Sequence, residues 1–556
     1  MSRTARLLPT LAAGLVLALA LNLPTSLADL GRIGTWAVPL ELVTALALCA
    51  LLPRPRRLLA ARLLAAPLAL LIAFRLVDWA VWRMMGRPVT LVFDVPLAGS
   101  LIALSRDSFG LPATVLLLLT AALTVLLLYV LTARFLSGLA GLGVARPAAL
   151  AVTLAAGSMA LAGMATPAPG RQVGLPLVSL HGFYQVAAQL ERAADAADAA
   201  RRWRQTAEAD PAEAIPPDLL LGRLDGVDVL VLFVESYGRT ALEQPAFAGT
   251  IRPRLATWER ALDAHGLSAA SGWLISPTVG GQSWLAHATL ASGIRTADQA
   301  SFRVYLERAS ADLAHLFARS GHRSVLAVPA ITEAWPELGR LGFETVYAAP
   351  DLGYRGPGFD WVTMPDQYTL ATLEALERGQ SMERRPLFLQ AALIGSHAPF
   401  TPIPPLVEDW TLIGDGSLFA GLPRHGGEAR EVWRDPASLK RHYLGALDLV
   451  LATIQAYSTR FVDRRTLLVV LGDHEPAPLV SGAPDERRVP VHVVSGDPGL
   501  LAPFRAWGLT AGTTPGADAA VHPMEAFRGF LLEAFSGRSE QEASAPAPGR
   551  GRGNGA

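Results

Sequence analysis

Acidic and histidine side chains follow directly after two strongly apolar runs of this sequence. Residues 229–234 form a nearly unbroken run rich in β-branched side chains, and Glu235 comes next. A second run, 467–471, leads after one glycine into Asp473 and His474. Runs of this length and composition are typical of strands buried on both faces of a parallel sheet. Because α/β proteins bind ligands beyond the carboxyl ends of their strands, these side chains are candidates for chemistry.

The candidate side chains are of the types that hold a divalent cation. Glu235 and Asp473 offer hard oxygen ligands, His474 offers an imidazole, and the glycine before Asp473 frees the backbone to turn inward. A third apolar run, 387–394, precedes His397 and places it on the same edge. Each piece alone is weak, because a carboxylate there can cap a helix and a lone histidine is commonly a loop residue. Together they predict a metal site.

Ser283 is the candidate nucleophile. It follows a glycine pair and opens a helical pattern, so it is expected to be an N-cap, where unpaired N–H groups favour an anion. A metal would lower the pKa of its hydroxyl and make it attack phosphorus or sulfur. Serine is also a common N-cap with no catalytic duty. His287, one turn further on, would contact the substrate or pack against Trp284.

The composition predicts a membrane protein with more than one domain. The 556 residues are 51% hydrophobic, and the apolar excess lies in the first third. The formal net charge is zero, so nothing suggests nucleic acid as a partner. Cys49 is the only cysteine, so the chain has no disulfide and no cysteine metal site. Five segments are long enough, or nearly so, to cross a bilayer: 8–28, 36–52, 63–82, 111–132 and 147–166.

Arginines suggest the orientation of these segments. They precede the first segment, follow the second and lie between the fourth and fifth, although some also lie in the opposite loop. If those sides are cytoplasmic, everything after residue 166 lies outside a cell (inner) membrane that the chain crosses several times. Arg75 and Asp78 fall three residues apart inside the third segment and could pair on one helical face.

The chain is expected to have four parts. Residues 1–166 form the membrane anchor, 167–215 a linker with an amphipathic helix over 182–208, 216–535 the catalytic domain and 536–556 a disordered tail. Trp203 lies among three arginines, which suits a lipid headgroup layer, although a plain spacer helix fits equally well.

Strand and helix patterns alternate in the third part, which predicts an α/β domain with a mostly parallel sheet. The strand-like runs are 229–234, 324–328, 387–394, 466–471 and 489–494. The helical patterns between them include 310–320, 368–378 and 440–461.

Four motifs in this order resemble those of a known family. They are Val-Glu-Ser-Tyr-Gly at Glu235, Gly-Gly-Gln-Ser at Ser283, Ser-His-Ala-Pro-Phe at His397 and Gly-Asp-His-Glu at Asp473. The chain resembles the membrane-anchored sulfatase-like enzymes of the alkaline phosphatase superfamily, nearest to lipoteichoic acid synthases and to phosphoglycerol and phosphoethanolamine transferases. The resemblance covers nearly the whole chain and implies an alkaline-phosphatase-like domain outside the cytoplasm after about five spans.

The resemblance also implies roles for individual residues. Glu235, Asp473 and His474, with the Ser283 oxygen, would bind one divalent metal ion, which is manganese, zinc or magnesium. Ser283 would stand where the transferases carry a nucleophilic threonine. His397 would touch the substrate phosphate, and Trp335 resembles a substrate-contacting tryptophan of the synthases.

This sequence departs from the family at two places. Trp-Leu-Ala-His follows Ser283 where the synthases have polar and acidic residues, and Pro336 and Glu337 follow Trp335 where they carry an arginine. The sequence after Ser283 also lacks the proline and arginine of the sulfatase modification motif, so an unmodified serine is expected. This favours phosphoryl chemistry over hydrolysis of sulfuric esters, and it leaves the headgroup open.

The interpretation is a membrane-bound phosphotransferase or hydrolase acting on a phosphoglycerol- or phosphoethanolamine-type headgroup. A membrane lipid is the expected donor and an envelope glycan or lipid a possible acceptor. The alternatives are a sulfatase-like phosphodiesterase or sulfuric ester hydrolase, an inactive membrane scaffold, and a serine esterase with Ser236 as nucleophile. On an extended strand end, the Ser236 side chain is expected to point away from the metal.

Overall fold

The structure is a computed structural model of the whole chain, and it describes eight stretches. They are residues 3–23, 37–85, 87–140, 146–164, 178–307, 312–333, 335–379 and 384–537. These stretches divide into two compact units, Met1–Ala197 and Asp198–Ala556. Each unit has apolar core clusters of its own. The predicted tail lies outside the described residues from 538 onward.

The first unit is helical, apart from a short parallel pair of strands, β1 (Val38–Pro39) and β2 (Val178–Ser179). Its helices are α1 (Arg3–Leu21), α2 (Leu40–Leu51), α3 (Arg54–Met85), α4 (Leu91–Asp94), α5 (Ala98–Ala140), α6 (Arg146–Met164) and the first part of α7 (His181–Glu208). Gly110, with a φ of 80°, breaks α5 into two helices before Pro112. Small residues and leucines of α1, α2, α3 and α5 form the core of this unit.

Two described helices are long and apolar enough to cross a membrane, namely Arg54–Trp82 and Gly110–Ala140. The apolar helices Leu8–Leu21 and Leu40–Leu51 are shorter. The prediction of five spans is therefore supported for the third and fourth segments only. The predicted pair inside the third segment does form, because Arg75 Nη1 lies 3.4 Å from Asp78 Oδ2. Cys49 is buried and free.

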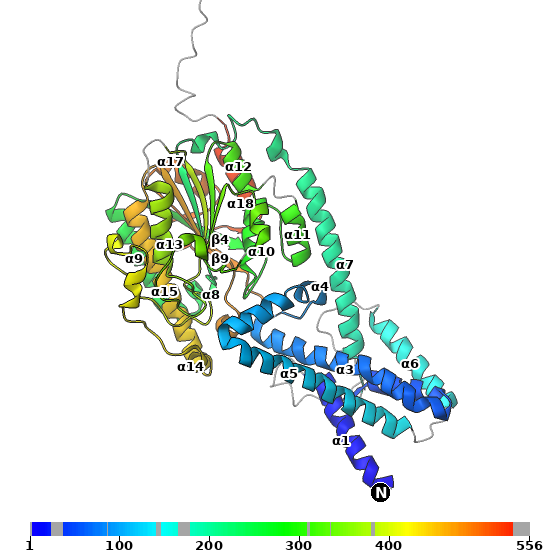
Figure 1. Cartoon of the computed structure of the whole chain (residues 1–556). Coiled ribbons are helices and arrows are strands. Elements are labelled where there is room, and N and C mark those ends of the chain that lie inside the picture. The colour runs from blue at the N-terminus through cyan, green and yellow to red at the C-terminus, as the bar shows by residue number, and fades with distance from the viewer. Residues whose placement is uncertain are drawn as a thin grey trace, which may run out of the picture. The chain divides into compact units, whose positions relative to one another are not determined.

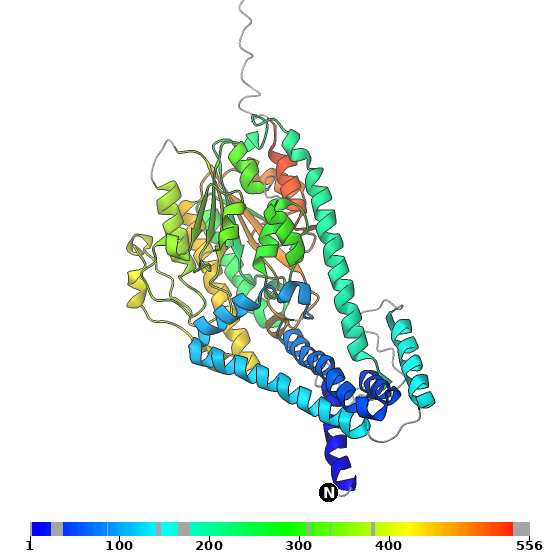
Figure 2. The same cartoon turned by 45° about the vertical axis from the view of Figure 1, so that its right-hand side comes forward.

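Helix α7, labelled in Figure 1 and seen again in Figure 2, confirms the helix expected over 182–208. The surroundings of its Trp203 differ from those that the sequence suggested. The Trp203 side chain is only 3% exposed, its ring lies edge-on to Tyr305, and its Nε1 donates to Thr296 Oγ1 at 3.1 Å. A headgroup contact is therefore wrong for this residue. The apolar ring is buried against α11 (Gln299–Glu307), and the polar indole N–H finds a protein partner.

The second unit contains a nine-stranded mixed sheet in the order β10-β4-β9-β8-β3-β7-β5-β6, with β11 paired to β4. Its strands are β3 (Asp228–Val234), β4 (Ser268–Ile275), β5 (Arg323–Val328), β6 (Thr345–Ala348), β7 (Leu387–Leu393), β8 (Thr466–Gly472), β9 (Arg488–Ser495), β10 (Thr510–Ala511) and β11 (Val521–Pro523). β3, β5, β6, β7 and β8 are parallel, whereas β9 is antiparallel to both β8 and β4.

The prediction of a mostly parallel sheet is thus confirmed for the half that carries the candidate residues, and it is wrong for β9, an interior strand that runs antiparallel to both neighbours. All five predicted strands exist within a residue or two of the expected bounds. The run 489–494 is apolar because β9 is covered on both faces, and burial of this kind does not reveal strand direction. β4 escaped prediction because its run contains three small residues, Ala269, Ala270 and Gly272.

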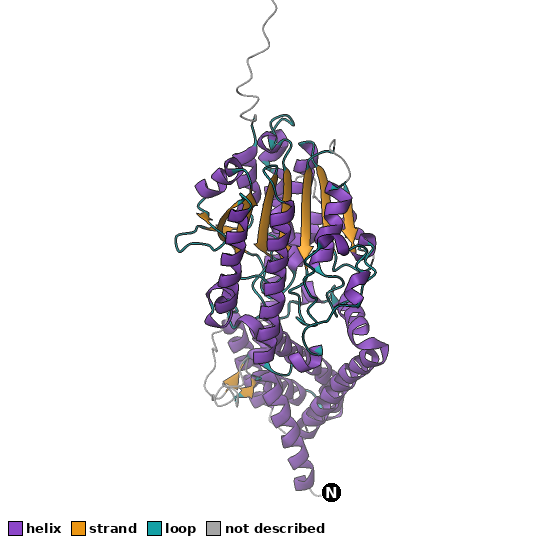
Figure 3. Cartoon of the chain, turned by 90° about the vertical axis from the view of Figure 1, so that its left-hand side faces the viewer, coloured by secondary structure: helices purple, strands orange, loops and turns teal. Residues whose placement is uncertain are grey.

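Helices cover both faces of the sheet, as Figures 1 and 3 show. One apolar cluster joins the sheet to α9 (Pro245–Ala264), α13 (Asp366–Leu373) and α15 (Pro436–Phe461). The other joins it to α10 (Ser283–Ser292), α12 (Leu313–Arg319), α17 (Pro498–Ala506) and α18 (Ala526–Phe535). Side chains of β3 alternate between the two clusters, so this strand is buried on both faces, as the apolar run predicts.

Candidate active site

Three neighbouring parallel strands end at the same edge of the sheet, and each leads into candidate residues. β3 lies between β7 and β8, with Val234 opposite Gly472 of β8. The Glu235 N–H donates to the Leu393 carbonyl at the end of β7. Gly472 is needed here, because a Cβ on it would clash with the Tyr237 carbonyl oxygen. This close approach of the two strand ends brings the segments after β3 and β8 together.

Glu235, Asp473 and His474 form one compact cluster. One ligand atom from each lies within 4.8 Å of the others. His474 Nε2 lies 3.3 Å from Glu235 Oε1 and 3.6 Å from Asp473 Oδ2. Ser283 joins them, since its Oγ donates to Glu235 Oε2 at 3.0 Å and lies 3.3 Å from His474 Nε2. The four residues predicted to share a metal are therefore adjacent, and Asp473 and His474 are almost fully buried.

The cluster is electrostatically unbalanced toward negative charge. Burial and the neighbouring Glu235 carboxylate raise the pKa of Asp473. Burial alone would lower the pKa of His474, but the charges of Asp473 and Glu235 outweigh it and raise the pKa to about 9. Burial raises the pKa of Glu235, yet the charges of His474 and His397 bring it well below its usual range. Two carboxylates this close, one buried and one partly buried, need a proton or a cation between them.

Ser283 is the first residue of α10 rather than its N-cap. The N-cap is Gln282, whose φ of 65° lies in the left-handed region, and its side chain makes no capping bond. The expectation of an N-cap serine is therefore wrong by one position. The start of α10 still favours an anion at Ser283, because this residue lies at the end of the helix where backbone N–H groups are unpaired.

Ser236 does not point away from the cluster. Its φ is 56°, so the extended backbone has already ended, and its Oγ donates to Glu235 Oε1 at 3.0 Å. Its N–H donates to Asp473 Oδ1 at 2.8 Å, and its carbonyl accepts from Tyr443 Oη at 2.9 Å. The prediction failed because it treated the chain beyond Val234 as extended strand. Ser236 instead fixes one oxygen of Glu235 while Ser283 contacts the other.

The structure brings both predicted histidines near the cluster. Loop geometry after β7 is set by Asp366, which accepts from the Ile394 and Gly395 N–H groups at 2.8 and 3.0 Å. His397 follows, half-buried, and its ring stacks at 5.6 Å on Trp361, a residue that the sequence reasoning missed. His287 stacks on Phe233 of β3 at 3.8 Å, so its ring is packed under the site.

His287 is uncharged at neutral pH. Burial lowers its pKa to about 4, although the nearby Glu235 charge works in the opposite direction. Its Nδ1 lies 3.3 Å from Nε2 of Gln390, a buried glutamine on β7. A neutral imidazole held in this way can donate or accept one hydrogen bond at the site but cannot supply positive charge.

Trp335 is not brought to the cluster by any contact among the described residues. Its ring stacks on Phe302 at 6.4 Å, and it belongs to an apolar group with Trp203, Leu285 and Tyr305. This group packs around α10 and α11. The predicted contact of Trp335 with the substrate stays a prediction.

The contacts that Glu475 makes behind the cluster were also missed. The Glu475 carboxylate accepts from Thr240 Oγ1 and, at 3.4 Å, from the Thr240 N–H. Its backbone carbonyl accepts from the Gly280 N–H at 2.9 Å and lies 3.0 Å from His474 Nδ1. Gly238 packs so closely on Glu475 that a Cβ would clash with its carboxylate. Glu475 therefore ties β3, β8 and the Ser283 loop together and orients His474 Nε2 toward Ser283.

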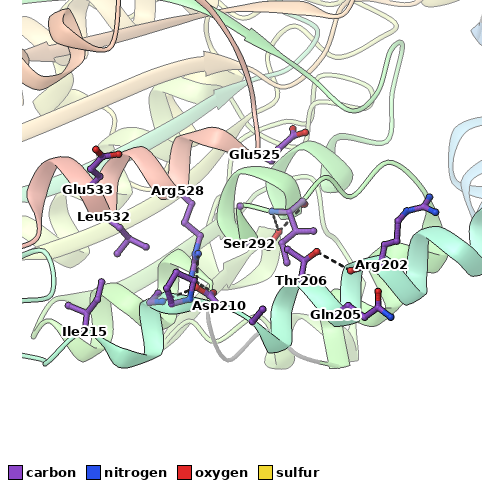
Figure 4. Close-up of a pocket in the computed structure, with 16 residues that line it drawn as sticks. Arg202, Gln205, Thr206, Asp210, Ile215, Ser292, Glu525, Arg528, Leu532 and Glu533 are labelled. Atoms are coloured by element: carbon purple, nitrogen blue, oxygen red, sulfur yellow. Dashed lines mark hydrogen bonds and ion pairs between the residues drawn. The ribbon is translucent and has the colours of Figure 1, made fainter.

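A cavity of about 780 Å³ lies at the other end of α10 from Ser283 (Figure 4). Ser292, at the end of α10, lines it together with residues of α7 and α18. On its wall, Arg528 Nη2 pairs with Asp210 Oδ2 at 2.5 Å, and Thr206 Oγ1 donates to the Arg202 carbonyl. None of the residues that line this cavity belongs to the predicted site.

Comparisons with known proteins return structures but no sequences. Neither a family model nor a curated protein matches the chain. An integral membrane lipooligosaccharide phosphoethanolamine transferase from Neisseria meningitidis matches with 12% identity and a TM-score of 0.47, covering 85% of both chains. A lipoteichoic acid synthase from Listeria monocytogenes matches with 14% identity and a TM-score of 0.35, covering 56% of this chain and 73% of that one.

A phosphoglycerol transferase from Streptococcus pyogenes, solved with sn-glycerol-1-phosphate, also matches. It has 13% identity and a TM-score of 0.36, and the match covers 61% of this chain and 80% of that one. These structures come from the group of enzymes that the sequence motifs resemble. At such identities and TM-scores they do not by themselves assign an activity, so an activity must be argued from the geometry of the cluster.

Proposed function

We propose that this chain is a metal-dependent phosphotransferase or hydrolase of the alkaline phosphatase superfamily, anchored in a membrane. The supporting observation is the convergence of Glu235, Asp473, His474 and Ser283 within hydrogen-bonding distances at the carboxyl edge of the sheet. The order of the four sequence motifs agrees with this assignment.

The donor set fits a divalent cation. The ion would be held by Glu235, Asp473, His474 and the Ser283 oxygen. The raised pKa values of Asp473 and His474 and the lowered pKa of Glu235 reflect two carboxylates beside one imidazole, and this arrangement favours a positive charge between them. Oxygen-rich ligation with one imidazole suits manganese, zinc or magnesium rather than a thiolate-type metal. Once bound, such an ion supplies a Lewis acid that lowers the pKa of the serine hydroxyl.

Ser283 would act as the nucleophile. Its Oγ forms a bond to phosphorus as the bond from phosphorus to the donor alcohol breaks, and that alcohol leaves with the proton. The amino end of α10, which begins at Ser283, stabilises the negative charge on the phosphoryl oxygens. Water or an acceptor hydroxyl then attacks the phosphorus of this serine-linked phosphodiester, the bond from phosphorus to Ser283 Oγ breaks, and Oγ takes up the proton of the attacking group. Hydrolysis and transfer share the first step.

The donor would be a membrane phospholipid with a phosphoglycerol or phosphoethanolamine headgroup, and the acceptor an envelope glycan or lipid. Support comes from the two apolar helices able to cross a bilayer, which would hold the catalytic unit at the membrane surface. The five-span arrangement with the catalytic unit outside the cytoplasm belongs to this proposal. His397, backed by Trp361, would contact the phosphate from the loop after β7.

One observation favours an alternative function, a serine esterase with Ser236 as its nucleophile. A left-handed backbone at the serine is typical of a nucleophile elbow, and Ser236 has it. However, Ser236 is 7% exposed and its hydroxyl is bonded to a carboxylate rather than to an imidazole. An esterase of that kind retains activity in EDTA, whereas the proposed enzyme loses it.

The test is a screen of phospholipid donors with the full-length chain in detergent, followed by mass spectrometry of its peptides. We expect release of diacylglycerol from one headgroup class and, when the acceptor is withheld, an adduct on Ser283 with the mass of the matching phosphoglycerol or phosphoethanolamine group. An adduct on Ser236, or turnover that EDTA leaves unchanged, would contradict the proposal.

A further inference from the structure

An exposed tryptophan lies in a basic stretch at the start of α15. The short helix α14 (Ala429–Val432) is followed by Trp433, whose side chain is 42% exposed. Trp433 is the only aromatic residue among the exposed large apolar side chains in the described part of the second unit. Tryptophan side chains are rarely this exposed in a folded protein, because the indole ring is the largest apolar surface that a side chain can bury. An amphipathic ring of this kind is favoured where water meets lipid headgroups.

The charge around Trp433 is positive. Residues 430–441 contain four arginines or lysines and two acids, while the whole chain has no net charge. Arg430 and Arg441 have side chains that are 74% and 68% exposed, and their ion pairs with Glu428 and Asp435 are equally open to solvent. Pairs this exposed are weak and screened, so the cations remain available to another anionic surface.

The stretch lies on the same edge of the sheet as the candidate active site. α15 runs back from this edge to the start of β8, so its first residues lie beyond the carboxyl ends of β3 and β8. Tyr443, two turns into α15, donates its hydroxyl to the Ser236 carbonyl at 2.9 Å, which fixes this end of the helix beside the site. Figure 1 shows α14 at that end of α15. Leu479, 37% exposed just after the Asp473 motif, lies on the same edge.

We propose that the surface formed by Arg430, Trp433, Arg434 and Arg441 docks the catalytic unit on a bilayer that contains anionic phospholipid. Trp433 enters the headgroup layer, and the arginines pair with lipid phosphates. One aromatic side chain or one basic cluster binds a membrane weakly, but the two together on a tethered domain are sufficient. Docking at this edge presents the Ser283 site to lipid. The inference rests on the proposed membrane anchorage and not on the proposed chemistry.

Site-directed spin labelling of the full-length chain in lipid nanodiscs tests this surface. In a Cys49→Ala background, one label replaces Ala437, exposed four residues after Trp433. The control label replaces Arg464, which is 76% exposed at the opposite edge before β8. Accessibility of each label to oxygen, which prefers lipid, and to a water-soluble nickel chelate reports its surroundings without any need for turnover.

In nanodiscs that contain phosphatidylglycerol, we expect a several-fold higher ratio of oxygen to nickel accessibility at position 437 than at 464. The ratio at 437 should fall to the value at 464 in phosphatidylcholine alone, in high salt, or when Trp433→Ser is combined with Arg430→Gln and Arg434→Gln. Equal ratios at 437 and 464 in phosphatidylglycerol would overturn the proposal, and would point to a protein partner for this surface. A high ratio at 437 that ignores lipid charge would overturn the anionic assignment.

Discussion

The two ends of strand β3 carry carboxylates in opposite surroundings. Asp228, at its start, accepts from Arg378 Nε at 2.9 Å, Arg384 Nη2 at 2.5 Å and the Leu387 N–H at 2.9 Å. Glu235, just past its end, faces Ser283, His474 and a second carboxylate. The first end is neutralised by permanent cations of the chain. The second sets two carboxylates against one imidazole, an arrangement that the proposed metal ion would neutralise.

A third carboxylate, Asp366 at the carboxyl edge, differs from Asp228 in the direction of its pKa shift. Burial raises the pKa of Asp228, but the hydrogen bonds and charges of Arg384 and Arg378 outweigh it and bring the pKa below its usual range. At the other edge, burial raises the pKa of Asp366 to about 7, and its partners among the described residues are the uncharged N–H groups of Ile394 and Gly395. The carboxylate at the amino edge is therefore stabilised as an anion, and Asp366 at the carboxyl edge is not.

The largest effect is expected from Ser283→Ala. Loss of the nucleophile should lower kcat by a factor on the order of 10³ or more. Stability should change little, because Ser283 is not the residue that caps α10. Ser236→Ala, which removes one hydrogen bond to Glu235, should cost about tenfold. Steady-state kinetics and thermal unfolding of both variants check this. A Ser236→Ala defect larger than that of Ser283→Ala would reverse the two assignments.

Asp228→Asn should damage the fold without damaging the site. Removing the anion leaves the Arg384 guanidinium without its carboxylate and Arg378 with Glu374 as its remaining acidic partner, which costs about 2 kcal/mol in the free energy of unfolding. Because the pKa of Asp228 is lowered in the folded state, its contribution is complete above about pH 4 and is lost as the pH falls further. Denaturant unfolding between pH 3 and pH 8 should show this deficit, while metal content stays at the wild-type level.

Thr240→Val tests the contacts that Glu475 makes behind the cluster. Valine keeps the shape of threonine but removes the hydroxyl that donates to Glu475 Oε1, which should cost about 1–2 kcal/mol. Since Glu475 also positions His474, affinity for the metal should fall several-fold. Thr257→Val on α9, which removes a hydroxyl contact to a backbone carbonyl, is the matched control. Metal titration that gives equal affinity for both variants would remove the positioning role.

The smallest effect is expected from Asp366, with a pH dependence opposite to that of Asp228. Its folded-state pKa of about 7 lies above the unfolded value of about 4, so the folded protein binds more protons between these values. The advantage of wild type over Asp366→Asn in the free energy of unfolding should therefore shrink as the pH rises from about 4 to about 7. An advantage that grew over this interval would mean that a cation reaches this edge and pairs with Asp366.

The same contrast explains what the sequence could predict. β3, β7 and β8 were recognisable because strands buried on both faces must be apolar throughout, and the residues directly after them had to share an edge. The convergence of Glu235, Asp473 and His474 followed from that rule. Partners fixed by tertiary contacts left no local signal: Thr240 reaches Glu475 across 235 positions, and Arg384 reaches Asp228 across 156.

Local backbone geometry accounts for the errors around the nucleophile. The left-handed conformations of Ser236 and Gln282 turned one hydroxyl inward and moved a helix start by one residue. Neither residue is a glycine, so the residue type did not indicate a left-handed backbone. For Trp203, flanking arginines suggested lipid, but burial depended on α11, which lies about 100 residues later in the chain. The five spans were expected from hydropathy, whereas helix length limits the structural support to two.

The most direct test of a metal site at the carboxyl end of β3 compares metal content at the two ends of this strand. Full-length wild type, the double variant Glu235→Ala with Asp473→Ala, and Asp228→Asn are purified in the same detergent and analysed by inductively coupled plasma mass spectrometry. We expect one equivalent of manganese, zinc or magnesium in wild type and in Asp228→Asn, and none in the double variant. Stoichiometric metal in the double variant, or its loss in Asp228→Asn alone, would contradict the placement of the metal at the carboxyl end of β3.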